Sequence, residues 1–185
     1  MRILRSSRYV WAAVVLLVTA GVAIVLADPD GSTADPADLR AQIERRMRTT
    51  LEQVSPEQHN HGGHQIPTTG GAEPSVVCGV RVYGYEPAEV KTLAGVRTVY
   101  GFHLCGVAEP QRPWDVAVKL AGPVIVDMAV SPPGIQVVEA TAETKYIDRL
   151  HEMFPPRYAD LAMKEALADT ELKDLRRRYN DAAGL

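Results

Sequence analysis

The sequence lacks the short motifs that mark the common enzyme classes. It has no G-x-S-x-G elbow, no H-E-x-x-H zinc motif, no phosphate-binding loop and no dinucleotide fingerprint. A basic stripe that follows a phosphate backbone is also absent, and the formal net charge is -3. These absences argue against nucleic acid as a partner. They make an enzyme the less favoured class, and we expect no cofactor.

Charged side chains are absent from Tyr9 to Ala27, a run that consists almost entirely of apolar residues. At about 1.5 Å per residue, a helix of this length crosses most of a hydrocarbon core about 30 Å thick. Residues 1–8 contain three arginines and no acid, so they predict a basic cytoplasmic tail with the remaining chain outside. We therefore expect a transmembrane signal anchor over residues 9–27, which makes the lipid bilayer a partner.

The same apolar run allows an alternative, in which the chain is secreted. Val25-Leu26-Ala27 has the small-x-small pattern of a signal-peptide cleavage site. The run is longer than the apolar region of about 7–15 residues that signal peptides usually have, so the anchor is favoured. Both interpretations export the domain, either to the outer side of the cell membrane or, after cleavage near Ala27, to the medium.

Cysteine is scarce, since Cys78 and Cys105 are the only two. They lack the C-x-x-C spacing of a redox pair, and two thiolates with no third ligand nearby make a poor zinc site. An even number of cysteines in an exported chain normally forms disulfides. We expect a structural bridge between Cys78 and Cys105, although Cys105 lies opposite the aromatic face of its own predicted strand.

Residues 28–75 have the composition of a spacer that contains one amphipathic helix. Asp35 and Pro36 form a helix start, and Leu39, Ile43, Met47, Leu51 and Val54 recur at helical spacing among arginines and glutamates. Such a narrow stripe suits a dimerising stalk or a segment that touches lipid headgroups. The favoured interpretation is a first helix that lays its apolar stripe on the folded domain.

Three histidines, His59, His61 and His64, lie in a stretch from Ser55 to Ser75 that is rich in glycine and proline. Neutral imidazoles at this spacing are able to bind zinc, copper or nickel. A metal site also needs groups that orient the rings, and a glycine-rich loop supplies none by itself. The stretch is therefore interpreted as a flexible polar linker, with a metal site as the weaker hypothesis.

Residues 76–185 predict an α+β domain. Short alternating runs between residues 76 and 140, separated by turns, indicate an antiparallel sheet of four to five strands, with one short helix between the first two. One of these runs, WDVAVKL, alternates with Trp114 and Val116 inward. Three amphipathic runs over residues 143–154, 158–167 and 172–179 predict helices, expected mainly on one face of the sheet.

The polar residues near the predicted strands offer one weak catalytic pattern. His103 with Asp115 or Asp127 suits a base and its orienting group, yet these positions also fit the solvent face of a sheet. The leading functional hypothesis is a membrane-tethered extracytoplasmic interaction module that contacts an envelope protein or polymer. The alternatives are a metal or small-ligand carrier, which would use the histidine loop or a pocket between sheet and helices, and an exported enzyme.

Overall fold

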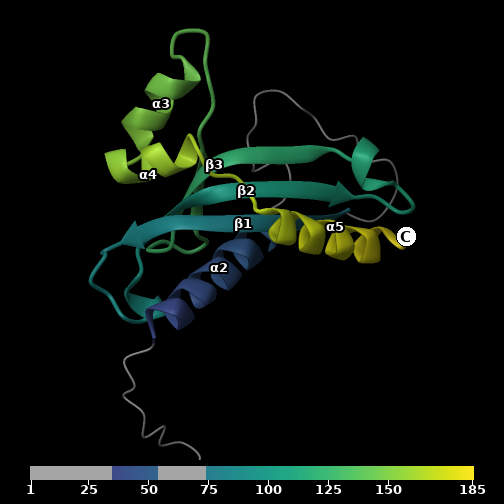
Figure 1. Cartoon of the computed structure of the whole chain (residues 1–185), viewed down its shortest axis with the longest axis horizontal. Coiled ribbons are helices and arrows are strands. Elements are labelled where there is room, and N and C mark those ends of the chain that lie inside the picture. The colour runs from purple at the N-terminus through teal and green to yellow at the C-terminus, as the bar shows by residue number, and fades with distance from the viewer. Residues whose placement is uncertain (1–34, 54–73) are drawn as a thin grey trace, which may run out of the picture. The chain divides into compact units, whose positions relative to one another are not determined.

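A computed structural model describes residues 35–53 and 74–185 of the chain, which are coloured in Figure 1. The predicted anchor at residues 9–27 and the histidine-containing stretch both lie outside the described residues. Within the described ranges, no helix combines the length and the apolar character that a membrane span requires. The unit that contains these ranges extends from Ala34 to Leu185.

Four strands form a single antiparallel sheet in the order of the chain (Figure 1). They are β1 (Ser75–Glu86), β2 (Thr98–Ala108), β3 (Lys119–Asp127) and β4 (Gly134–Val137). β-Branched residues and short connections favour this pattern, because antiparallel neighbours need only a turn between them. The predicted antiparallel sheet is confirmed. It leaves β1 and β4 as its two edges.

The predicted strand over WDVAVKL is wrong in its first half. Trp114–Val116 instead forms a 3-10 turn, η3, which follows Pro113, and Val116 is 67% exposed. β3 begins at Lys119 and continues through Gly122 and Pro123 to Asp127. The long partner strand β2 pairs along this whole stretch, and that ladder outweighs the local turn tendency of glycine and proline.

The predicted helix between β1 and β2 is reduced to one 3-10 turn, η2 (Leu93–Gly95). The register of the sheet also contains an irregularity that the sequence did not locate. The β1–β2 pairing shifts between Val82 and Gly84, which makes Tyr83 the extra residue of a bulge. Tyr83 keeps the face that alternation from Arg81 gives it, and the bulge brings Gly84 to that face and Tyr85 to the opposite one.

Helix α2 (Pro36–Gln53) covers one face of the sheet. Asp35 Oδ1 accepts a hydrogen bond from the backbone N–H of Ala37 at 2.9 Å, which satisfies an unpaired donor at the start of the helix. Four residues of the apolar stripe are buried against the valines of the strands, namely Leu39, Ile43, Met47 and Leu51, and Val54 lies outside the described residues. This is the arrangement that the favoured interpretation of the stripe describes.

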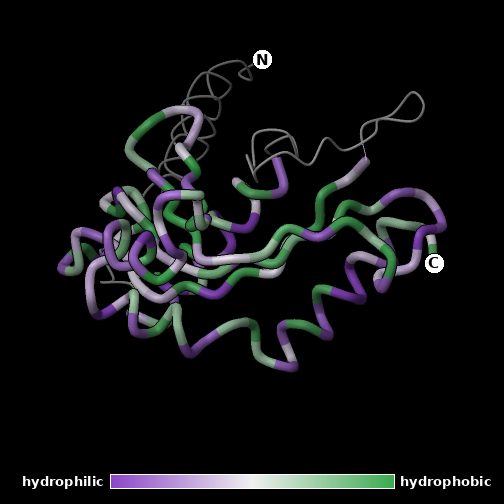
Figure 2. Tube along the Cα trace, turned by 90° about the horizontal axis from the view of Figure 1, so that it is seen from above, coloured by the Kyte–Doolittle hydropathy of each residue, from purple (hydrophilic) through white to green (hydrophobic). Residues whose placement is uncertain are grey.

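The other face of the sheet carries three helices, α3 (Tyr146–Met153), α4 (Pro156–Ala162) and α5 (Asp169–Ala183). A Cβ atom on Gly84 would collide with the ring of Tyr158, so the absence of a side chain there lets α4 approach β1 closely. In Figure 2, the tube that leads through α5 to the C-terminus alternates hydrophobic and hydrophilic residues, as an amphipathic helix does. Helices therefore cover both faces of the sheet.

The predicted disulfide is present. Cys78 and Cys105 are direct partners in the β1–β2 register, with a Cα–Cα distance of 4.0 Å, and both side chains are fully buried under α2. Cys105 does lie opposite the aromatic face of β2. Because α2 covers the cysteine face and α3 to α5 cover the aromatic face, the two observations are compatible.

Candidate functional site

A groove follows the outer edge of β1, where helices α2 and α5 run alongside the strand (Figure 1). Its volume is about 280 Å³. The floor is β1, one wall comes from α2 and the other from the first three turns of α5. The lining residues are Glu44, Arg48, Gly79, Val80, Thr170, Glu171, Asp174 and Arg178.

At one end of this groove, side chains from both helices form hydrogen bonds with the backbone of β1. The N–H of Cys78 donates to Glu52 Oε1 at 3.0 Å, and the carbonyl of Cys78 accepts from the guanidinium of Arg178 at 2.6 Å. Arg178 also contacts Glu52 at 3.0 Å and Asp174 at 3.0 Å. These contacts protect an edge whose unpaired backbone groups would otherwise be open to pairing with another strand.

The opposite end of the groove is closed in the same way, because the guanidinium of Arg40 donates to the carbonyl of Val82. Backbone groups of successive strand residues point alternately to the two sides of the strand. Cys78 and Val82 both point away from β2, so Val80, which lies midway between them, does so as well. The N–H and C=O of Val80 therefore face the groove, and no hydrogen bond within the described residues occupies them there.

The charges of the groove are largely compensated. Glu44 lies 3.5 Å from Arg40, Glu171 lies 2.8 Å from Arg81, and Asp174 is bound by two arginines. Hydrogen bonds from Arg178 and Arg177 lower the pKa of Asp174 below its usual value. Arg48 differs from these groups, because it forms no ion pair with any residue in the described parts of the chain. Among the described residues, it is the cation of the groove that has no acidic partner.

The histidines predicted as weak metal ligands, His59, His61 and His64, lie outside the described residues. Among residues 35–53 and 74–185, no group of three or more histidine, cysteine, aspartate or glutamate side chains has the arrangement of a metal site. The metal-site hypothesis for the histidine stretch therefore stays a prediction.

The weak catalytic pattern does not come together in space. His103 is fully buried on the α2 face, and its Nδ1–H donates to the carbonyl of Gly122 at 2.9 Å. Asp127 lies at the far end of β3, opposite Thr98. Asp115 belongs to η3 and its side chain is 85% exposed. The structure thus makes His103 a core residue.

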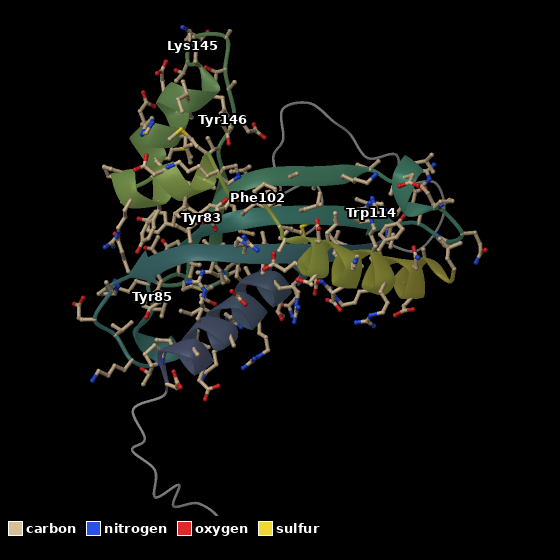
Figure 3. All side chains as sticks on the ribbon, in the orientation of Figure 1. Tyr83, Tyr85, Phe102, Trp114, Lys145 and Tyr146 are labelled. Atoms are coloured by element: carbon tan, nitrogen blue, oxygen red, sulfur yellow. A yellow bond between two sulfur atoms is a disulfide. The ribbon has the colours of Figure 1, made fainter. Side chains whose placement is uncertain are left out.

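Aromatic side chains gather in two other places on the α3–α5 side of the sheet (Figure 3). Tyr100 stacks on Tyr158 with ring centroids 5.0 Å apart, beneath α3 and α4. Trp114 packs edge-on against Tyr179, and Lys119 lies 5.1 Å from the centre of the indole. Both clusters are explained by helix packing.

Sequence patterns missed Arg48, Val80 and Arg178 as site residues. Arg48 and Arg178 are two of several arginines on predicted amphipathic helices, and nothing in the sequence distinguishes them from the others. The one usable indication was the predicted bridge, because opposed cysteines in antiparallel strands suit a pair whose backbone groups point outward. Val80 is two residues from Cys78, so its backbone groups point the same way. This identifies Val80 as a site residue only after β1 is known to be an edge strand.

Comparisons with protein-family models, with curated proteins and with solved structures give no match to this chain. The site is therefore interpreted from its own geometry.

Proposed function

We propose that this chain is a membrane-tethered, extracytoplasmic interaction module of the cell envelope, and that the groove on β1 is its binding site. The observation that carries the proposal is that the groove contains both the outward-facing backbone of Val80 and the side chain of Arg48, which has no acidic partner among the described residues. A free edge-strand backbone and a guanidinium are groups by which proteins recognise peptides. Both are mounted on packed elements, which keeps the site in place before a partner arrives.

Export supports the same proposal. The basic residues 1–8 and the uncharged residues 9–27 predict an anchor with the domain outside. The disulfide between Cys78 and Cys105 suits an oxidising compartment. In this arrangement the anchor confines the domain to the membrane surface, which raises its effective concentration towards other envelope components.

The predicted topology is tested with a C-terminal reporter that is active only outside the cytoplasm. The full-length fusion is expected to be active and to stay in membranes that are washed with carbonate. Replacing Arg2, Arg5 and Arg8 with glutamate is expected to reduce correct insertion, because the positive-inside bias is lost. If instead a C-terminal reporter that works only in the cytoplasm is active, the proposal is contradicted. Release of the intact fusion from the membranes by carbonate contradicts the anchor.

The place of binding is tested in the same cells with a photoreactive amino acid. Substituted at Thr170, which lines the groove, it is expected to yield a crosslink to an envelope partner. Substituted at Thr49, which is exposed on another side of α2, it serves as the matched control. Equal crosslinking from both positions, or crosslinking from Thr49 alone, contradicts the assignment of the groove.

A further inference from the structure

We infer that the groove binds a short extended peptide segment of an envelope protein and that an acidic side chain of this segment pairs with Arg48. The inference rests on the proposed function and names the chemistry of its ligand. It follows from three properties of the site, which are the backbone of Val80, the face to which Val80 points and the charge of Arg48.

The backbone of Val80 specifies an extended segment. Its N–H and C=O both face the groove and offer one donor and one acceptor to a chain lying in the plane of the sheet. The amides of an extended peptide complement such a pair in either strand direction. The neighbouring outward positions, Cys78 and Val82, are already bound by Glu52, Arg178 and Arg40. The pairing is therefore centred on a single residue of β1.

The side chain of Val80 fixes the direction of the ligand side chain. Val80 is buried on the α2 face of the sheet. Residues directly opposite each other on paired strands place their side chains on the same face. The ligand residue opposite Val80 consequently points to the α2 wall, where Glu44 and Arg48 lie. The ligand residues on either side of it point to the α5 wall, where Thr170 lies.

The charge of that wall selects an acidic residue. Glu44 is held by Arg40 at 3.5 Å, whereas Arg48 forms no ion pair with the described residues. On the α5 wall, Glu171 is bound by Arg81 at 2.8 Å and Asp174 by Arg178 at 3.0 Å. A carboxylate opposite Val80 gains a charge-assisted hydrogen bond from a guanidinium, and a lysine there would face that cation.

The size of the groove limits the segment to a few residues. Its volume of about 280 Å³ is near the lower limit of small-ligand sites. The contacts of Arg178 and Glu52 at one end, and of Arg40 at the other, stop the pairing from spreading along β1. The partner segment therefore crosses the edge briefly and does not extend the sheet.

The test uses the full-length chain in lipid nanodiscs and a labelled peptide, fluorescein-Gly-Ser-Thr-Glu-Thr-Ser-NH2, in an anisotropy titration. The matched Gln peptide is expected to bind about tenfold more weakly or worse, because a hydrogen bond to a charged group is lost. The Arg48→Gln variant is expected to lose the preference for the Glu peptide. The control Arg46→Gln changes an exposed arginine of α2 that lies outside the groove, and this variant is expected to bind as the parent does.

A second measurement separates binding in the groove from general charge attraction. In amide NMR spectra of the nanodisc sample, the Val80 N–H is expected to shift on titration with the Glu peptide. Binding that leaves this amide unmoved, or that is unchanged in Arg48→Gln, overturns the inference. If neither peptide binds while photocrosslinks from Thr170 persist, the ligand chemistry is wrong and the proposed function stands. Loss of both contradicts the groove as a binding site.

Discussion

Among single residues, Tyr83 has the most informative environment. It is the extra residue of the β1 bulge, it is 6% exposed, and its hydroxyl donates to the carbonyl of Glu165 beyond α4. Burial raises the pKa of Tyr83 well above its usual value, and the proximity of Tyr146 and Glu165 raises it further. The folded state thus disfavours the phenolate. Figure 3 shows Tyr83 and Tyr146 on the same side of the sheet.

This environment makes stability depend on alkaline pH. Because the folded pKa of Tyr83 is raised, its contribution is fully present below the unfolded pKa of about 10 and decreases as the pH rises above it. The Tyr83→Phe variant is expected to be about 0.5–1.5 kcal/mol less stable at pH 7, since the hydrogen bond is lost. As the pH rises from 9 to 11, the free energy of unfolding in urea is expected to fall less in the variant than in the parent. Parallel pH profiles of the two proteins would contradict this account.

At the scale of the elements, the edge of β1 is held by two helices from opposite ends of the chain. Arg178 of α5 connects the carbonyl of Cys78 to Glu52, which is in the last turn of α2. Its side chain is 24% exposed, so these charge-assisted hydrogen bonds are partly protected from water. A single guanidinium thus joins α2, β1 and α5 at the border of the groove.

Replacement of Arg178 is therefore expected to destabilise the protein. Arg178→Met keeps much of the apolar stem and removes the hydrogen bonds, with an expected loss of about 2–3 kcal/mol in the free energy of unfolding. The matched control is Arg177→Met, because Arg177 is 65% exposed and its ion pairs, with Asp174 and Asp181, lie within α5. Its expected loss is below about 1 kcal/mol. Equal losses in denaturant unfolding of the two variants would remove the special role of Arg178.

At the scale of the whole molecule, the disulfide ties the first two strands together beneath α2. It closes a loop with a sequence separation of 27 residues, which the chain-entropy model credits with roughly 3.5 kcal/mol. β1 packs against both α2 and α5 more extensively than β2 does. Fixing β1 to β2 therefore supports both helical layers and the groove between them.

Replacement of Cys78 and Cys105 together by alanine is expected to lower the stability of the exported protein by about 2–5 kcal/mol. Mass spectrometry of the unreduced parent is expected to identify the peptide pair joined through the two cysteines. The reduced parent serves as a control, since it should be destabilised to a similar extent without any substitution. Full alkylation of both thiols before reduction would show that the bridge does not form in the exported protein.

The class of the domain and its disulfide follow from the amino-acid sequence alone. Alternating β-branched runs predicted the antiparallel sheet, two lone cysteines predicted the disulfide, and Leu39 to Leu51 predicted the buried stripe of α2. These features are local, because the side-chain period and the residue type already set which face is apolar. Nothing local predicted η3 or the continuity of β3, since Trp114 is held by Tyr179 and β3 by its pairing with β2.

The groove, in contrast, depends on how the strands and helices assemble. Whether a backbone amide is open depends on which strand lies at the edge, and strand order is a property of the assembled sheet. Arg40, Arg48 and Arg178 look alike in the sequence as exposed cations on helices. The fold uses Arg40 and Arg178 to close β1 and leaves Arg48 beside Val80, because α2 and α5 meet that strand from opposite faces.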